Sequence, residues 1–214
     1  MQLERVTVPI GKANFSYMMN CYLVSAGKDA TDVIIVDPGG GAQHILTTLG
    51  ARTVIAIILT HCHIDHTIAL DGLRSLWEKG GVPIYVHALD KAAVVSNLKR
   101  HGEEQLGMDI EPYLVPLEDM ALLTFKGFEF EVLHTPGHSA GSMCLYEKDA
   151  KVLLSGDTLF RGTTGRTDLE TGNPFQMHES LQLLAQLPDE TVVYPGHDMS
   201  TSIAYERRRA LVEY

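Results

Sequence analysis

The sequence predicts an α/β fold built on mixed β-sheets, and three observations support that prediction. Segments with strand and helix patterns alternate along both halves of the chain, which is typical of layered α/β domains. Several predicted strands follow one another across short turns, as in mixed rather than purely parallel sheets. The chain has 214 residues, of which 45% are hydrophobic and 21% charged, so it can bury a substantial core. We therefore expect a single domain over residues 1–214.

The first half of the chain contains four predicted strands and three predicted helices. Runs of apolar and β-branched residues between turn signals predict the strands. Apolar residues at helical spacing predict the helices, two of which end at a glycine. The predicted strands are 20–24, 32–37, 53–59 and 82–87, and the predicted helices are 42–49, 67–79 and a segment from 88 to about 98.

The second half contains four further predicted strands and two predicted helices. One helix begins at Asn173-Pro174, because proline is tolerated in the first helical turn. The other covers the last residues, from about Ser202. The segment 101–116 is ambiguous and is assigned to neither helix nor strand. The predicted strands are 128–134, 142–147, 151–155 and 191–194.

The charge and the cysteine content exclude several classes of protein. A formal net charge of −10 disfavours a nucleic acid as partner. The longest apolar run, 54–59, is far shorter than the roughly 20 residues of a membrane span, and the first residues lack the pattern of a secretory signal. The 3 cysteines cannot all pair within the chain, which fits a reducing compartment. We expect a cytoplasmic protein with no nucleic-acid or membrane partner.

The segment 61–66, with the sequence HCHIDH, contains three histidines and an aspartate. In an extended segment the side chains at i and i+2 point the same way, so His61 and His63 can share one metal ion. The turn into the following helix redirects Asp65 and His66 toward a second point. Neutral imidazole and carboxylate groups bind zinc, ferrous iron or manganese. The motif therefore predicts a metal site rather than a solvated histidine-rich loop.

Three later residues occur in one common setting. His138, Asp157 and His197 each follow the end of a predicted strand and stand beside a glycine that allows a tight turn. Loops at one edge of layered sheets can converge, and ligand sites of α/β folds often lie there. These three residues are therefore candidates for the same metal centre.

Taken together, these residues resemble the motif set of the metallo-β-lactamase superfamily, and the resemblance runs from Val36-Asp37-Pro38-Gly39 to the last helix. It implies a four-layer αβ/βα sandwich of two mixed β-sheets with helices on the outer faces, and two metal ions at one edge of the sheets. It also implies a ligand set by position. His61, His63 and His138 would hold one metal, Asp65, His66 and His197 would hold the other, and Asp157 would bridge both.

Asp157 indicates a branch of that superfamily. The antibiotic-hydrolysing members typically have cysteine or serine at this position, whereas the glyoxalase II-type thioester hydrolases have aspartate. The stretches 156–160, 165–168 and 194–197 are similar to small bacterial glyoxalase II-like (hydroxyacylglutathione hydrolase-like) proteins, and this similarity implies that Arg166 and Asp168 line the substrate site. The chain departs from full-length glyoxalase II, which has a C-terminal helical domain, because only 17 residues follow His197.

The expected function is hydrolysis of a small acyl thioester such as S-lactoylglutathione. Two divalent cations about 3.5–4 Å apart can share a hydroxide at neutral pH, and this bridging hydroxide would attack the thioester carbonyl. Asp157, as the bridge, and Asp65, which would orient the hydroxide, are the predicted catalytic residues. We expect two zinc ions, with iron or manganese as alternatives, and no organic cofactor.

The alternative is a mononuclear iron persulfide dioxygenase acting on glutathione persulfide. These enzymes share the fold, a similar stretch at 60–66 and a similar stretch at 165–168. Their single iron is held by the counterparts of His61, His138 and Asp157. A purely structural metal site is disfavoured, because such sites are usually closed and rich in cysteine.

Two neighbouring residues have open roles. Asp37, between a predicted strand and Pro38-Gly39, is either a support for a metal ligand or a simple turn residue. Cys62 stands at the odd position of the motif, so we expect it to pack in the core rather than to bind metal.

Overall fold

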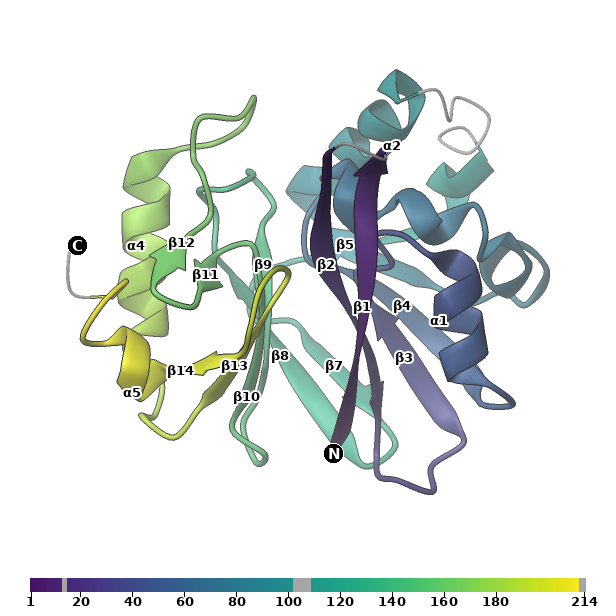
Figure 1. Ribbon diagram of the computed structural model, residues 1–214, viewed down its shortest axis with the longest axis horizontal. Helices are drawn as coiled ribbons and strands as arrows, with labels where there is room; N and C mark the ends of the chain where they lie inside the picture. Colours follow the sequence, from purple (N-terminus) through teal and green to yellow (C-terminus); the bar gives the residue numbers. More distant parts are fainter. Residues whose placement is uncertain (13–14, 102–108, 212–214) are drawn as a thin grey trace. The chain divides into compact units, whose positions relative to one another are not determined.

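The computed structural model describes residues 1–12, 15–101 and 109–211 (Figure 1). By its internal contacts the chain divides into two compact units, Met1–Pro116 and Leu117–Tyr214. The prediction of a single domain over residues 1–214 stays a prediction. No helix among the described residues is long and apolar enough to cross a membrane.

Unit 1 contains a mixed six-stranded sheet in the order β1-β2-β3-β4-β5-β6. Strand β2 pairs antiparallel with β1 and β3, whereas β4 pairs parallel with β3 and β5. The parallel strands therefore end at one edge of the sheet, and Asp37 and His61 follow directly beyond two of these ends. The strands are β1 (Gln2–Lys12), β2 (Phe15–Ser25), β3 (Asp32–Val36), β4 (Thr53–Leu59), β5 (Ile84–His87) and β6 (Leu114–Leu117).

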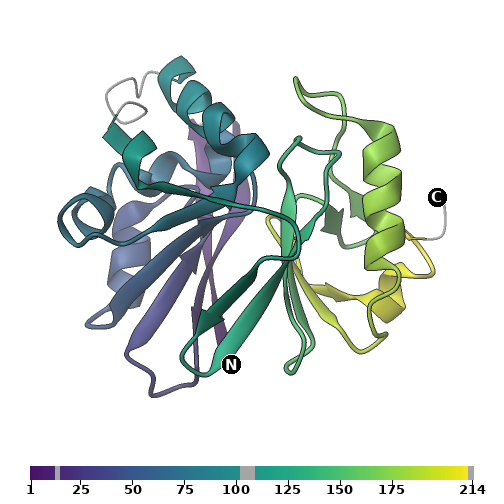
Figure 2. The ribbon, with the colours of Figure 1, turned by 180° about the vertical axis from the view of Figure 1, so that it is seen from behind.

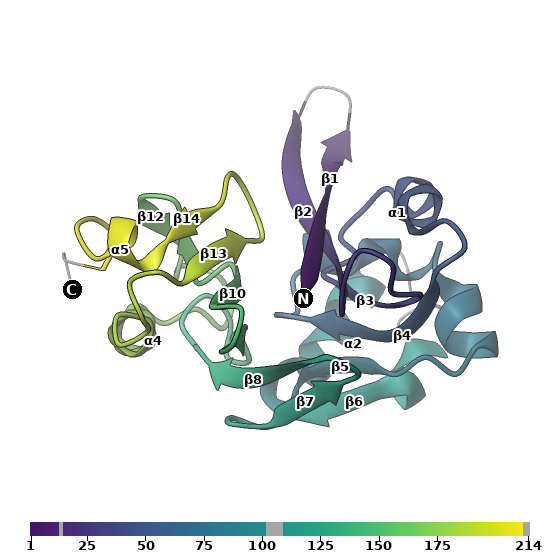
Figure 3. The same ribbon diagram turned by 90° about the horizontal axis from the view of Figure 1, so that it is seen from below.

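Helices pack on one face of this sheet through a single core cluster. Ile45 of α1 (Ala42–Leu49), Trp77, and Val94 of α2 (Lys91–Arg100) share that cluster with Ile35 and Ile57 of the sheet. Figure 3 shows the long β1–β2 pair beside β3 and β4. Shorter 3-10 helices complete the unit: η1 (Ile64–His66), η2 (Ile68–Leu70), η4 (Ala88–Asp90) and η5 (Glu111–Tyr113).

The predicted helix over 67–79 is wrong as a single α-helix. The structure has η2 followed by the π-helical turn η3 (Ser75–Lys79). The carbonyl oxygen of Leu70 accepts from the N–H of Leu73 at 3.2 Å, a 3-10 bond, and from the indole of Trp77 at 2.9 Å, while the N–H of Arg74 bonds to Asp71 instead. A Cβ on Gly72 would lie 2.4 Å from the Cβ of Ala42, so this segment packs tightly on α1.

Unit 2 contains a second mixed six-stranded sheet, in the order β14-β13-β10-β9-β8-β7. Strands β10 and β13 are parallel and the other pairs are antiparallel. A small hairpin, β11 (Leu159–Phe160) and β12 (Thr163–Thr164), follows Asp157. The main strands are β7 (Leu122–Phe125), β8 (Phe128–His134), β9 (Met143–Glu147), β10 (Val152–Gly156), β13 (Val192–Pro195) and β14 (Thr201–Ser202).

Helix α4 (Pro174–Leu184) packs on one face of the sheet of unit 2 (Figure 2). Met177 and Leu181 lie in one core cluster with Leu153 and Val193. The helix begins as predicted, because the side chain of Asn173 accepts hydrogen bonds from two backbone N–H groups of the first turn. The predicted last helix is short: α5 covers only Ile203–Glu206.

Some strands have no sequence-based prediction. The largest is β1, although Val6, Val8 and Ile10 alternate as strand residues do. Within the unassigned segment 101–116, η5 and part of β6 are described, whereas residues 102–108 lie outside the described residues.

Candidate metal centre

The loop after β4 brings the four candidate ligands of unit 1 together. His61 and His66 are buried, and His63 and Asp65 are half-buried. The ligand atoms of His61 and His63 lie within 4.8 Å of each other, and the same holds for His61 with His66 and for Asp65 with His66. The extended backbone at His63 and the following 3-10 turn η1 produce this grouping. The pairing of His61 with His63 agrees with the i, i+2 argument from the sequence.

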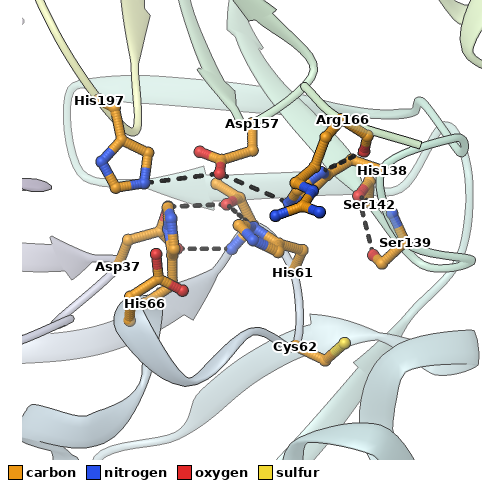
Figure 4. Close-up of polar contacts among 12 residues, drawn as sticks. Asp37, His61, Cys62, His66, His138, Ser139, Ser142, Asp157, Arg166 and His197 are labelled. Carbon is orange, nitrogen blue, oxygen red and sulfur yellow. Dashed lines mark hydrogen bonds and ion pairs between the residues drawn. The ribbon is translucent and has the colours of Figure 1, made fainter. Parts of the chain in front are cut away.

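Asp37 organises two of these histidines. Its Oδ1 accepts from the backbone N–H of Thr60 at 2.7 Å, and its Oδ2 accepts from the Thr60 hydroxyl at 2.7 Å. The Nδ1 atom of His66 lies 2.9 Å from the same Oδ2 (Figure 4). An ionised carboxylate only accepts hydrogen bonds, so Nδ1 of His66 donates and Nε2 has the lone pair for a metal.

The same network sets the tautomer of His61. The Thr60 hydroxyl donates its one hydrogen bond to Asp37, so it accepts a hydrogen bond from the Nδ1 atom of His61, which lies 3.1 Å away. His61 therefore also presents the lone pair of Nε2. Of the two roles left open for Asp37, the structure favours the support of ligands, in the manner of outer-shell carboxylates at metal sites.

Cys62 lies in the core of unit 1, as expected for a packing residue. Its backbone is held on both sides: its N–H donates to Asp90 Oδ2 at 2.8 Å, and its carbonyl accepts from Asn97 Nδ2 at 3.0 Å. These bonds fix the peptide between His61 and His63. The sequence-based prediction missed Thr60, Asp90 and Asn97. The position of Asp90 shortly after a strand parallel to β4 was a signal that could have found it.

In unit 2, Asp157 lies between two histidines. Its Oδ2 is 3.5 Å from Nε2 of His138 and 3.5 Å from Nε2 of His197 (Figure 4). Ligand bonds to zinc of about 2.0–2.2 Å at a tetrahedral angle place two donor atoms about 3.4 Å apart. The observed separations therefore fit one carboxylate that serves a cation on each side.

Backbone groups support the ligands of unit 2. The Nδ1 atom of His138 lies 2.8 Å from the carbonyl oxygen of Arg166, so Nδ1 donates and Nε2 again has the lone pair. A Cβ on Gly165 would lie 1.8 Å from the carbonyl oxygen of Asp157 and 3.2 Å from Cγ of His138. Only glycine allows the 165–166 segment to approach the two ligands this closely.

The side chains of Arg166 and Asp168 form an exposed ion pair. Nε and Nη2 of Arg166 donate to the two carboxylate oxygens at 2.7 and 2.8 Å. The hydrogen bond from Arg166 lowers the pKa of Asp168 to about 2, and Asp168 raises the pKa of Arg166. The predicted role of both residues in substrate binding stays a prediction. Arg166 contacts the candidate ligand His138 through its backbone carbonyl rather than through its guanidinium group.

Other nucleophiles fit the structure poorly. The stretch GHSAG at 137–141 matches the Gly-x-Ser-x-Gly pattern of serine hydrolases, so the sequence-based interpretation that the chain has no such motif is wrong. It connects two strands rather than a strand and a helix, and Ser139 is fully buried with its hydroxyl 2.8 Å from Ser142. Burial raises the pKa of Cys144 to about 11 and also raises the pKa of Cys21, so neither is a ready thiolate.

The donor groups of each unit suit a divalent cation. His61, His66 and His138 each offer Nε2, and the carboxylates of Asp65 and Asp157 lie beside imidazole nitrogens of their own unit. Imidazole with carboxylate is a ligand chemistry shared by zinc, iron and manganese, so the residues fit a metal without selecting one.

Comparisons with known proteins give a family match and related hydrolases. The family model described as "Metallo-beta-lactamase superfamily" matches residues 17–197. "Probable metallo-hydrolase YqgX" of Bacillus subtilis is 37% identical over 180 residues, which cover 81% of this chain and 83% of the relative. "Hydroxyacylglutathione hydrolase GloC" of Haemophilus influenzae is 29% identical over 199 residues, which cover 90% of this chain and 92% of the relative.

Solved structures match over nearly the whole chain. The crystal structure of BLEG-1 B3 metallo-beta-lactamase has a TM-score of 0.75 at 32% identity and covers 97% of both chains. TTHA1623 in a di-iron-bound form has a TM-score of 0.74 at 32% identity, covering 96% of this chain and 98% of that one. ETHE1 from Myxococcus xanthus has a TM-score of 0.69 at 25% identity, covering 95% and 82%. The predicted fold class, two mixed β-sheets with helices, is confirmed.

Proposed function

The chain belongs to the metallo-beta-lactamase superfamily and is a metal-dependent hydrolase, and we propose that it hydrolyses small acyl thioesters. The observation that carries this proposal is the position of Asp157 between two histidines, with Oδ2 at 3.5 Å from Nε2 of both His138 and His197. A carboxylate in this position could bind two metal ions, one beside each histidine. The similarity to GloC supports the thioester class and S-lactoylglutathione as the first substrate to assay.

We propose that the ligand groups of the two units together hold two divalent metal ions. His61, His63 and His138 would bind one, Asp65, His66 and His197 the other, and Asp157 both. The short distances within each unit and the di-iron form of TTHA1623 support this assignment. Zinc is the metal proposed first, with iron or manganese as the alternatives.

Bound metals would supply a hydroxide at neutral pH and positive charge for the developing oxyanion. The residues of the chain prepare the site for this chemistry. Asp37 and Thr60 hold His61 and His66 in the tautomers that present Nε2. Asp65 is proposed to orient the attacking water through its carboxylate. Arg166 and Asp168 are proposed to contact the substrate.

We propose a small-molecule substrate, without a nucleic-acid or membrane partner, and a cytoplasmic location. The described cysteines are all buried and none is in a disulfide, which supports a reducing compartment. A glutathione-derived thioester would be available in such a compartment.

A second candidate is persulfide dioxygenation, which the similarity to ETHE1 favours at lower identity. It needs one iron per chain instead of a metal pair. Hydrolysis of a β-lactam is a third outcome to assay, because the BLEG-1 structure is described as a lactamase.

The deciding experiment combines metal analysis with three assays on one preparation. Protein from metal-balanced medium is analysed by element, then assayed for S-lactoylglutathione hydrolysis, oxygen uptake with glutathione persulfide, and hydrolysis of a chromogenic β-lactam. Two metals per chain with thioester turnover is the expected result. One iron with oxygen uptake would replace the proposal by the second candidate. A fully metallated protein without thioester turnover would reject the proposed substrate class.

A further inference from the structure

The side chain of Tyr17 contacts the ligand loop of unit 1. Its hydroxyl donates to Asp65 Oδ2 at 3.0 Å, although the two residues are 48 positions apart in the sequence. The distance of 3.0 Å between the two oxygens lies within the range of a formed O–H···O hydrogen bond. Tyr17 itself is 50% exposed, so its phenol ring lies at the surface of the unit while its hydroxyl reaches the carboxylate. Nothing in the proposed reaction requires this tyrosine, so the contact needs its own explanation.

The register of β2 places Tyr17 against η1. Met19, Cys21 and Leu23 are buried in the core cluster of unit 1. Since side chains alternate along a strand, Tyr17 extends the same face by one more position. The next residue on that face, Met19, lies close to the loop 37–40, because a Cβ on Gly39 would be 2.7 Å from the sulfur of Met19. The contact therefore belongs to a packed part of the unit.

The backbone of Asp65 is fixed as tightly as its side chain. A Cβ on Gly39 would lie 1.6 Å from the carbonyl oxygen of Asp65, so the 37–40 loop presses directly on this residue. The backbone contact fixes the position of the main chain of Asp65, and the hydrogen bond from Tyr17 fixes the orientation of its carboxylate. A carboxylate oxygen of Asp65 lies within 4.8 Å of a ring nitrogen of His66, so a carboxylate held by Tyr17 is placed to share a cation with His66.

We propose that Tyr17 is a positioning residue for Asp65. Its hydroxyl holds the carboxylate in the orientation in which Asp65 and His66 bind a divalent cation. The inference rests on the proposed function, because it takes Asp65 as a ligand of the second metal. Removing an outer-shell partner of a ligand typically lowers metal affinity about 10–100-fold. Because the hydrogen bond of Tyr17 is to Asp65, we expect its loss to weaken the metal that Asp65 and His66 would bind.

The test compares Tyr17→Phe with Tyr85→Phe, which removes the same hydroxyl from the half-buried Tyr85 of β5. Stepwise zinc affinities are measured by competition with a chromogenic chelator, and the visible spectrum is recorded after cobalt substitution. We expect Y17F to bind the first zinc as wild type does and the second about 10-fold more weakly, with a changed spectrum for the second cobalt. Y85F should match wild type in both measurements. Thermal unfolding of the metal-free proteins confirms that Y17F is folded.

The other outcomes separate this inference from the proposed function. Two metals in wild type, with unchanged affinities and an unchanged cobalt spectrum in Y17F, would overturn the role of Tyr17 and leave the metal pair intact. Equal weakening of both metals in Y17F would also overturn it, because the effect would be general. A raised KM with unchanged metal affinities would place Tyr17 at the substrate and likewise overturn the positioning role. A wild-type protein that binds one metal would overturn both proposals.

Discussion

The two units support their candidate ligands by different means. In unit 1 a buried carboxylate, Asp37, and the hydroxyl of Thr60 set the tautomers of two histidines. In unit 2 the corresponding support for His138 is a backbone carbonyl, that of Arg166. Support by a side chain can be removed by one substitution, whereas support by a carbonyl can be disturbed only by moving the backbone. The ligands of the two units should therefore respond differently to mutation.

One device is common to both units. In each unit a glycine lies against the carbonyl oxygen of a candidate ligand aspartate. A Cβ on Gly39 would lie 1.6 Å from the carbonyl oxygen of Asp65, and a Cβ on Gly165 would lie 1.8 Å from the carbonyl oxygen of Asp157. In each unit, close packing of the main chain fixes the backbone position of the aspartate. The units thus share the way they place an aspartate and differ in the way they orient histidines.

The largest effect is expected at Asp157, the residue that the proposed metal pair would share. Asp157→Ala removes the carboxylate between His138 and His197 and should lower thioester turnover by roughly 100-fold or more, as loss of a key charged group does. Metal content measured by element should also fall. Asp149→Ala, which removes an exposed carboxylate from the same unit, is the matched control and should behave as wild type. A D157A protein with wild-type turnover and metal content would remove the basis of the proposal.

The close approach of Gly39 and Gly165 to the aspartate carbonyl oxygens is tested with Gly39→Ala and Gly165→Ala. The new methyl group would overlap a backbone oxygen, so each variant should lose about 1–3 kcal/mol of unfolding free energy, the usual cost of overpacking. Gly27→Ala is the control, because a Cβ there meets nothing within 4 Å. Urea unfolding measures the free energies, and metal analysis shows whether the G165A variant also loses the metal beside His138. Stabilities equal to that of G27A would mean that the close approach is unimportant.

The difference in histidine support is tested with Asp37→Asn. Asparagine tolerates the positive φ of 52° at this position, so the backbone is kept. Its amide places N–H donors where the carboxylate accepted, which drives His66 to carry its proton on Nε2 and removes the lone pair for the metal. Metal affinity should fall about 10-fold or more. Chelator competition measures the affinity, and nitrogen-15 NMR of the imidazoles reports the tautomer. An unchanged tautomer and affinity would show that Asp37 is only a turn residue.

The sequence could point to the candidate ligands because each follows the end of a strand. The contiguous motif at 61–66 leaves β4, and His138, Asp157 and His197 follow β8, β10 and β13 beside a glycine. Such signals are local, since a strand pattern and a turn residue lie within a few positions of each other.

The supporting contacts could not be predicted in the same way, because they depend on which strands are neighbours. Asp37 meets Thr60 and His66 because β3 pairs in parallel with β4, with Val36 opposite Ile58. The contact of Tyr17 with Asp65 joins residues 48 positions apart. The apolar period at 67–79 also predicted one α-helix, whereas the backbone there forms 3-10 bonds and the indole of Trp77 bonds to the carbonyl of Leu70.

The smallest effect is expected at the exposed pair of Arg166 and Asp168. Arg166→Ala keeps the backbone carbonyl that contacts His138, so metal content should not change. If the pair contacts the substrate as proposed, KM for S-lactoylglutathione should rise while kcat stays near the wild-type value. Glu190→Gln, which breaks another exposed pair of unit 2 with Lys151, should leave KM unchanged. Loss of metal in R166A would show that the guanidinium supports His138 after all.

The same pair gives a pH dependence with a defined sign. The folded-state pKa of Asp168, about 2, lies below its ordinary value of 3.8, so the pair stabilises the folded protein above that ordinary value and stops doing so as the pH falls through about 2. Thermal unfolding of wild type and Asp168→Asn should therefore differ by a small amount near pH 5 and converge below pH 2. An exposed ion pair contributes little to stability, so a large difference near pH 5 would mean that Asp168 has a structural role beyond its contact with Arg166.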